Sequence, residues 1–272
     1  MIATELYGGQ GLGNQLWAYV VTRLIADHKG CDFGIMSPER FKGKDFMDLD
    51  FGRKIEGVSE MPTSSLPESI INYHKETCEL FGTDDGSGID KELFNIPLNT
   101  KVDGNFQSYS YIRGKENKVR EWLKFKALHR TSEDTCIIHM RCGDYKNIQD
   151  VFLPLGYYQE AMEVIRKINP HVNFFVVSDE PSLAYKFLGV PSIGGVGEDK
   201  HKAAHHLGGD IGVDFSYLAN AKYVIIPNSS FGWWAAFLNT NAEAIVAPKY
   251  WCGWKDSEWR TGDIKSDNFL YV

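Results

Sequence analysis

Residues 228–234 read N-S-S-F-G-W-W, and their types and spacing are suited to binding an anion. An apolar run with strand character precedes them, and a helical pattern continues from them to residue 238. Small polar residues between a strand and a helix place hydroxyl groups and free backbone N–H groups at a helix N-terminus, which attracts phosphate. An ordinary N-cap explains one serine, but it does not explain Asn228, the second serine and the two tryptophans together. Because Trp233 and Trp234 follow the turn inside the helix, we expect them to brace that helix against the sheet.

A second polar segment, H-M-R-C-G-D-Y at residues 139–145, ends a short apolar strand. Arg141 at a strand end can present its planar fork to a diphosphate. Asp144 could orient Arg141 or accept a proton from a substrate hydroxyl, and an Arg–Asp pair that only stiffens the loop is the alternative. His139 falls on an alternating strand position, so a hydrogen-bonded core histidine and a catalytic one are both open.

The third segment, G-G-Q-G-L-G-N-Q at residues 8–15, lies between the first strand and the first helix. Its glycines let the backbone approach a ligand closely, and Asn14 and Gln15 offer amide donors at the helix start. A bare glycine turn is the alternative, because a lone glycine-rich loop is not specific.

Strand and helix patterns alternate along the chain, which predicts an α/β fold with mostly parallel sheets covered on both faces. Ligands bind at the carboxyl ends of strands in such sheets, where the three polar segments fall. Residues 32–101 show only weak patterns and are expected to form irregular loops with short helices. Strands are predicted at residues 2–7, 102–106, 135–140, 173–178, 223–226 and 244–247, and helices at residues 14–28, 115–129, 156–168, 181–188, 213–220 and 229–238.

The composition excludes several functional classes. The net charge of −7 argues against general binding of nucleic acid, which needs a basic face. The five cysteines are odd in number and none are spaced C-x-x-C, so we expect neither a disulfide framework nor a zinc knuckle, and a reducing compartment. No signal peptide and no membrane span are expected, which predicts a cytoplasmic protein. Peripheral contact with the inner face of the membrane is left open.

We expect no metal site. Asp48 and Asp50 have D-x-D spacing, but they lie in the irregular region, far in sequence from the phosphate segments. A solvated loop is the preferred interpretation of His201, His205 and His206, which lack a carboxylate partner of the zinc-protease type. The tail carries three tryptophans that could stack on sugars or pack on the fold, and packing is preferred: Trp251, Trp254 and Trp259.

Together these segments resemble the α-1,2-fucosyltransferases of glycosyltransferase family eleven. The family's G-x-L-G-N-Q, Q-S-x-x-Y and H-x-R-x-G-D-Y motifs are matched at residues 11–15, 107–111 and 139–145. Its S-D segment, its D-x-x-x-M/L helix, its N-S-[ST]-F-x-W-W turn and its A-P-x-x-W segment are matched at residues 178–179, 214–218, 228–234 and 247–251. Cys142 stands where the family usually has a second arginine, which removes one positive charge.

This resemblance implies a GT-B-like pair of Rossmann-type domains, an acceptor-side domain at residues 1–130 and a GDP-fucose-binding domain at residues 131–272. It implies an inverting, metal-independent transfer of L-fucose from GDP-β-L-fucose to the 2-hydroxyl of a terminal galactose on a glycan. GDP-fucose would be a substrate, so no cofactor is expected. The catalytic candidates are Arg141, Asp144 and His139. The donor-binding candidates are Asn14, Gln15, Asp179, Asp214, Asn228, Ser229, Ser230 and Phe231. Asp179 and Asp214 would contact guanine or ribose, with ordinary helix caps as the alternative.

Two other hypotheses stay open at this point. The first is an enzyme of the same architecture that transfers another deoxysugar from a GDP-sugar or fucosylates a protein. The second is a non-catalytic glycan-binding protein, for which the tryptophan-rich tail would be the support. The sequence leaves open the acceptor glycan, the general base and the oligomeric state.

Overall fold

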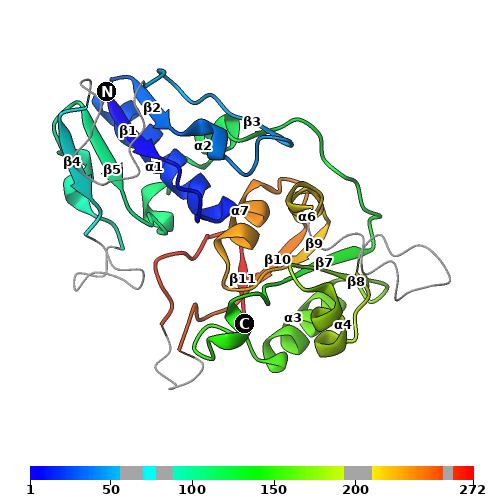
Figure 1. The fold of residues 1–272 in the computed structure, drawn as a ribbon. Helices are drawn as coiled ribbons and strands as arrows, with labels where there is room; N and C mark the ends of the chain where they lie inside the picture. The colour runs from blue at the N-terminus through cyan, green and yellow to red at the C-terminus, as the bar shows by residue number, and fades with distance from the viewer. Residues whose placement is uncertain (56–69, 78–87, 193–209, 254–259) are drawn as a thin grey trace. The chain divides into compact units, whose positions relative to one another are not determined.

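A computed structural model describes residues 1–55, 70–77, 88–192, 210–253 and 260–272 (Figure 1). The chain divides into two compact units. The first holds Met1–Lys126 and Gly262–Ile264, and the second holds Ala127–Thr261 and Lys265–Val272. The main division lies close to the boundary expected at residue 130. The return of three late residues to the first unit has no counterpart in the sequence patterns.

The first unit is built on a four-stranded parallel sheet with the strand order β2-β1-β5-β4. Helix α1 (Leu12–Lys29) packs against β1 and β2 and buries the apolar side chains of Leu16, Trp17 and Val20. The strands are β1 (Ile2–Glu5), β2 (Phe33–Met36), β4 (Asn72–Lys75) and β5 (Thr100–Asp103).

A short antiparallel ladder and several single turns complete this unit. The ladder pairs β3 (Met47–Asp48) with β6 (Lys124–Phe125). The helical segments are α2 (Glu116–Trp122) and the 3-10 turns η1 (Pro38–Arg40), η2 (Lys91–Phe94) and η3 (Tyr109–Tyr111).

Residues 262–264, late in the chain, are hydrogen-bonded to the η3 turn. The Ser108 hydroxyl donates to Asp263 Oδ2 at 2.5 Å, and the Tyr109 N–H donates to the Asp263 carbonyl at 2.6 Å. Gly88, with φ +63°, packs so closely on Asp263 that a Cβ there would lie 2.2 Å from the Asp263 Cβ. Residues 262–264 are therefore held in the first unit by both backbone and side-chain contacts.

Two predictions for this half of the chain were wrong. The region expected to be irregular contributes two strands of the sheet, β2 and β4. The helix expected over residues 115–129 ends at Trp122, and β6 follows it. Short strands depend on their partners in the sheet more than on their own residues, and β6 exists because Phe125 pairs with Met47.

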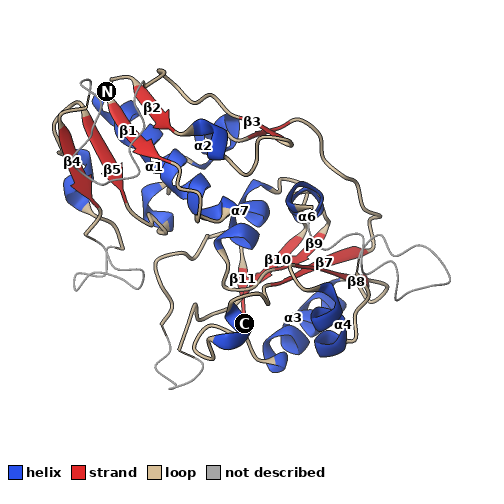
Figure 2. Cartoon of the chain, in the orientation of Figure 1, coloured by secondary structure: helices blue, strands red, loops and turns tan. Residues whose placement is uncertain are grey.

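The second unit is built on a five-stranded sheet with the order β11-β10-β9-β7-β8, parallel throughout. Figure 2 shows α3 and α4 on one face of this sheet and α6 and α7 on the other. Its strands are β7 (Thr135–Met140), β8 (Asn173–Ser178), β9 (Tyr223–Ile225), β10 (Ala244–Ala247) and β11 (Leu270–Tyr271). Its helices are α3 (Leu155–Ile168), α4 (Pro181–Leu188), α6 (Ile211–Leu218) and α7 (Ser230–Leu238), with the 3-10 turn η4 (Tyr145–Asn147).

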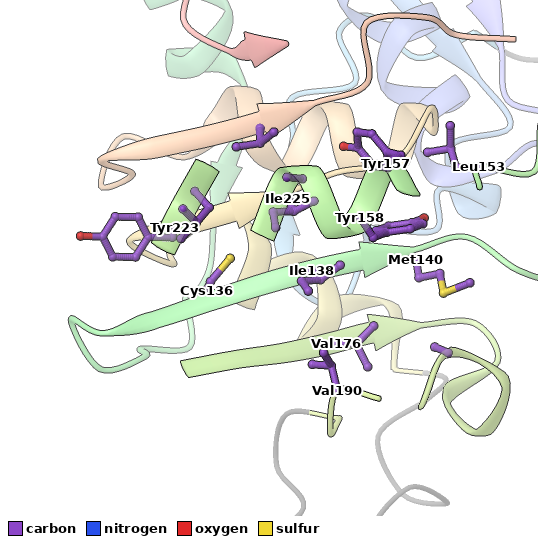
Figure 3. Packing of buried hydrophobic residues seen from close by; sticks show 14 of the residues in the cluster. Cys136, Ile138, Met140, Leu153, Tyr157, Tyr158, Val176, Val190, Tyr223 and Ile225 are labelled. Atoms are coloured by element: carbon purple, nitrogen blue, oxygen red, sulfur yellow. The ribbon is translucent and has the colours of Figure 1, made fainter. Parts of the chain in front are cut away.

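The apolar core of this unit lies largely between α3 and the sheet (Figure 3). Ile138 and Ile225 point from neighbouring strands toward Tyr158, and the Tyr157 hydroxyl donates to the Ile226 carbonyl. Cys136 is a buried residue of this core, as predicted. The predicted ends of β7, β8, β10 and α4 are confirmed to the residue.

The two parallel sheets confirm the predicted GT-B-like fold class with Rossmann-type domains. In each sheet one strand has its next neighbour in sequence on one side and a much later strand on the other. These strands are β1, between β2 and β5, and β7, between β8 and β9. Loops diverge at such switch points, which leaves a crevice for ligands at the carboxyl ends of the strands. None of the described helices is both long and apolar enough to span a membrane.

Candidate functional site

The switch point of the second unit brings together the two motifs that end β7 and β9. The Tyr145 hydroxyl, just after β7, donates to the Asn228 carbonyl, just after β9, at 3.3 Å. The ring of His139, in β7, lies 5.2 Å from that of Phe231 in the first turn of α7. The two segments at residues 139–145 and 228–234 are therefore in contact at this edge of the sheet.

The N-terminus of α7 opens at this edge without a side-chain cap. Ser229 occupies the N-cap position with extended backbone angles, φ −123° and ψ 129°, and its side chain makes no capping hydrogen bond. Ser230 is the first helical residue. A helix that begins without its own capping acceptor can offer first-turn N–H groups to an anion.

The side chain of Asn228 anchors this turn to two other loops. Its Nδ2 donates to the Val151 carbonyl at 2.9 Å and to the Trp251 carbonyl at 2.6 Å. The side chain is buried, and its amide nitrogen links two loops of the second unit. Asn228 thus fixes the backbone that carries Ser229 and Ser230, a role that the motif alone did not indicate.

The two tryptophans brace α7, as expected. Trp233 and Trp234 are buried, and their rings meet edge to face at 5.1 Å. Trp233 also stacks on Phe237 at 5.2 Å with an interplanar angle of 7°. Trp251 is likewise buried, which confirms packing for this residue of the tail. Trp254 and Trp259 lie outside the described residues.

Arg141 emerges from the end of β7 between two carboxylates. Its Nη1 lies 2.6 Å from Asp179 Oδ2 and its Nη2 lies 2.7 Å from Asp144 Oδ1. The Asp144 side chain is 63% exposed and that of Asp179 is 29% exposed. Asp179 also accepts from the Cys142 N–H at 2.8 Å, so it is the anchored partner and Asp144 the solvated one.

The loop around Arg141 leaves no room for larger residues. Gly143 has φ +20°, and a Cβ there would lie 2.5 Å from Asp179 Oδ2. Cys142 is fully buried, with the Ser178 hydroxyl 3.5 Å from its Sγ. Burial raises the pKa of the Cys142 thiol, which is therefore neutral where the family usually carries a cation.

His139 is enclosed between β7 and α7. A Cβ at Gly232 would lie 2.5 Å from His139 Nδ1, and among the described residues Nδ1 has no hydrogen-bond partner. Burial, with a smaller contribution from Arg141, lowers the pKa of His139 to about 3. The imidazole is neutral at pH 7 but very weakly basic, and its surroundings match a packing residue better than a proton acceptor.

Neither Asp179 nor Asp214 is a helix cap, so that alternative was wrong. Glu180 holds the N-cap position of α4, and Asp210 caps α6 by accepting from the N–H groups of Gly212 and Val213. Asp214 lies one turn into α6 and is buried. Burial, then Asp210 and Asp179, raise the pKa of Asp214 to about 7.

The raised pKa of Asp214 predicts a pH-dependent stability. Between pH 4 and pH 7 the folded protein keeps a proton that the unfolded chain has lost, because the pKa rises from 3.8 to about 7 on folding. The free energy of unfolding therefore falls as the pH rises through this window, by up to about 1.4 kcal/mol per unit. Asp214→Asn should remove this slope, so that the variant gains stability relative to the native protein from pH 5 to pH 7.5.

Urea unfolding of both proteins at several pH values measures this difference. A difference that stays constant across the window would contradict the assigned pKa of Asp214.

The two predicted donor-binding residues of the first unit, Gln15 and Asn14, differ in what their side chains bind. Gln15 is fully buried, and its amide donates to the Arg40 carbonyl at 2.9 Å and accepts from the Lys42 N–H at 2.9 Å. Both ends of that side chain are thus used to hold a loop. Asn14 Oδ1 accepts from Gln107 Nε2 at 2.9 Å, which joins two family motifs at the switch point of the first sheet.

The described residues contain no group of three or more His, Cys, Asp or Glu side chains that could hold a metal ion. Of the two aspartates with D-x-D spacing, Asp50 has its Oδ2 3.9 Å from Arg23 Nη2, and Asp48 is exposed. His201, His205 and His206 lie outside the part of the chain that the structure describes.

The sequence patterns missed one cluster of charged and polar residues. Glu5, Tyr7, Lys101 and Asp103 meet at the carboxyl ends of β1 and β5. The alternation of polar residues in the predicted strand at 102–106 could have indicated Asp103, but a buried lysine in the sheet is not expected from its type.

Comparison with known proteins gives one family and several distant relatives. The family model described as Glycosyl transferase family 11 matches residues 61–272. The O-antigen biosynthesis glycosyltransferase WbnK of Escherichia coli is 27% identical over 134 residues, which cover 47% of this chain and 42% of the relative. An alpha-1,2-colitosyltransferase of Escherichia coli is 31% identical over 120 residues, which cover 42% of this chain and 40% of the relative.

The match therefore spans about two fifths of the length of these two relatives. Among solved structures, the NodZ alpha-1,6-fucosyltransferase soaked with GDP-fucose aligns with a TM-score of 0.46 and 16% identity. That alignment covers 87% of this chain and 92% of the NodZ chain.

Proposed function

The chain belongs to glycosyl transferase family 11, and from this premise we propose that it transfers L-fucose from GDP-β-L-fucose to the 2-hydroxyl of a terminal galactose on a glycan. We further propose that the transfer inverts the anomeric centre and needs no metal. The name of the colitosyltransferase relative supports an α-1,2 linkage, and that of the O-antigen relative supports a cell-surface glycan as acceptor.

The observation that carries this proposal is that Arg141, after β7, and the N-terminus of α7, after β9, follow neighbouring strands at one switch point, where the Tyr145 hydroxyl donates to the Asn228 carbonyl. The guanidinium supplies a full positive charge in a planar fork, and the uncapped helix turn supplies oriented donors. A diphosphate presents oxygens to both, which a neutral sugar does not. The arrangement therefore favours a nucleotide-sugar enzyme over a glycan-binding protein.

The proposed reaction breaks the bond between fucose C1 and the β-phosphate oxygen, so that GDP leaves, and forms a bond from C1 to the galactose 2-oxygen, which releases its hydroxyl proton. Negative charge develops on the leaving β-phosphate, and without a metal it needs a fixed cation and preorganised donors. Arg141 is held ready for this by Asp179. The more exposed Asp144 is the partner that a phosphate oxygen would replace at Nη2.

The two groups first considered as general base are better assigned to positioning. An inverting displacement requires the base on the face of the sugar opposite the leaving group. Asp144 is bound to the guanidinium that would face the leaving phosphate, and His139 is too weakly basic. We propose that Asp144 orients Arg141 and that His139 packs β7 against α7.

Asp214 keeps its proposed role near the nucleoside, whereas Asp179 is reassigned to positioning Arg141, because its Oδ2 contacts Arg141 and its Oδ1 accepts from the Cys142 N–H. Asp214 is buried one turn into α6, and α6 packs against α7. A buried carboxylate is suited to accept hydrogen bonds from the N1 and N2 groups of guanine or from ribose hydroxyls. The pairing would favour its ionised form.

Transfer of another deoxysugar is the second candidate function, and the name of the colitosyltransferase relative favours it. The direct test incubates the purified protein with GDP-fucose or GDP-colitose and lactose in the presence of EDTA. We expect a fucosylated product whose linkage, determined by NMR, is α-1,2. If the protein binds GDP but transfers only from GDP-colitose, colitose replaces fucose as the assigned donor sugar. Failure to bind GDP would refute the proposal.

A further inference from the structure

The switch point of the first unit carries a polar cluster that the donor chemistry does not use. Lys101 lies in β5 beside β1, and its Nζ is 2.7 Å from Glu5 Oε2 and 2.9 Å from the Tyr7 hydroxyl. The Tyr7 hydroxyl donates to Asp103 Oδ2 at 2.8 Å, and Lys101 Nζ is 3.5 Å from the same oxygen. We define Glu5, Tyr7, Lys101, Asp103 and Tyr73, which pairs with Lys101 in the adjacent strand β4, as the β1–β5 cluster.

Exposure increases from the base of this cluster to its tip. The Glu5 and Lys101 side chains are 0% and 1% exposed, whereas that of Asp103 is 14% exposed. Glu5 and Lys101 balance each other's charge in the interior. Asp103 is the additional carboxylate, and it lies at the carboxyl end of β5, where loops diverge and a ligand can reach it.

The loop at residues 8–11 follows β1 next to the cluster, and the fold does not require its glycines. Gly8, Gly9 and Gly11 are exposed, none has a positive φ, and a Cβ at each would have no atom within 4 Å. Neither backbone conformation nor packing within the described residues therefore demands glycine at these positions. The remaining use of a side-chain-free loop is to let a ligand approach the backbone closely.

The charges of the cluster decide the class of that ligand. Glu5, Lys101 and Asp103 together carry one net negative charge, which disfavours phosphate. A carboxylate flanked by tyrosine hydroxyls accepts hydrogen bonds from neutral donors. Burial raises the pKa of Asp103, against the opposing effects of Lys101 and the two tyrosine hydroxyls. Neutral polyhydroxyl compounds, which means sugars, satisfy all of these conditions.

We propose that the β1–β5 cluster is the binding site for the acceptor sugar, in which Asp103 accepts a hydrogen bond from an acceptor hydroxyl and the glycine loop at residues 8–11 lies against the sugar. This inference rests on the proposed function for the identity of the sugar, a terminal galactoside. The site itself belongs wholly to the first unit.

The test compares Asp103→Asn with the native protein in two independent measurements. Saturation-transfer NMR with methyl β-D-galactoside, without any donor, reports sugar binding directly. Steady-state kinetics with GDP-fucose and lactose reports the KM of each substrate. We expect the variant to lose most of the NMR response and to raise the lactose KM by about 10-fold or more, the usual effect of losing a hydrogen bond to a charged group. The GDP-fucose KM and the Kd for GDP should stay within about 2-fold, well under that.

Asp48→Asn, a change at an exposed aspartate of the same unit, is the matched control and should alter neither measurement. Gly9→Ala provides a second variant, since the backbone there accepts alanine without strain, and it should weaken galactoside binding at unchanged thermal stability.

Unchanged galactoside binding in both test variants would overturn the inference, as would an equal loss of galactoside and GDP binding in Asp103→Asn. The protein could bind galactoside through Asp103 and yet not turn over GDP-fucose. That result would refute the proposed donor but would support the sugar site.

Discussion

Replacing Arg141 with alanine is expected to lower kcat/KM for GDP-fucose by about 100- to 1000-fold, as the loss of one preorganised donor to a developing oxyanion does in other enzymes. The variant removes the cation that we assign to the leaving phosphate and leaves the carboxylates of Asp144 and Asp179 without the guanidinium between them. Arg141→Lys should recover only a small part of the rate. An ammonium group cannot bind two oxygens in the geometry of the guanidinium fork.

Arg166→Ala is the matched control for this experiment. Arg166 lies in α3 of the same unit and pairs with Glu163 at 2.5 Å, but it is exposed and lies away from the carboxyl edge of the sheet. Its loss should change the rate by less than about 2-fold, since exposed ion pairs contribute little. Retention of transfer by Arg141→Ala within a factor of about three would remove Arg141 from the mechanism, because a charge facing the leaving group is worth far more.

Replacing Lys101 with methionine is expected to destabilise the first unit by about 3–5 kcal/mol, the typical effect of removing one partner of a buried ion pair. Glu5 is fully buried beside Lys101, with its second oxygen near the Ser37 hydroxyl at 3.4 Å. In the variant that carboxylate would remain in the interior without its cation. Urea unfolding, followed by tryptophan fluorescence, measures the loss.

The double variant Glu5→Gln with Lys101→Met separates charge from packing. It removes both charges at nearly constant volume, so we expect it to recover more than half of the lost stability. A double variant no more stable than Lys101→Met would mean that the lysine acts through its packing and not through its charge.

Local residue patterns were sufficient for much of the second unit. The apolar runs that form β7 and β10 are buried along their whole length, and that of β8 is buried in its second half, so their residues alone mark their ends. In the first unit, β4 reads N-Y-H-K and owes its place to pairing with β5. No local pattern encodes such a partner, which explains why this strand was not predicted.

In the candidate site, too, the sequence predicts some features and not others. That residues 139–145 and 228–234 belong together follows from their positions after strands, since strand ends in a parallel sheet share one edge. What each side chain contacts does not follow. Gln15 and Asn228 have the residue types of ligand donors, yet their amide N–H groups bond loop carbonyls that are distant in sequence. The basicity of His139 depends on its enclosure by α7, which no single motif reveals.

The attachment of Asp263 to the first unit limits how this protein can be divided or recombined. Neither unit is one continuous piece of chain, because residues 262–264 interrupt the second and complete the first. A fragment that ends at Lys126 would lack both acceptors that Asp263 offers to Ser108 and Tyr109. A hybrid that takes its second half from another family member would carry a foreign residue into that position. Exchange of specificities between relatives would therefore need the residue at 263 to be inherited together with the first unit, although most of the second unit separates them in the gene.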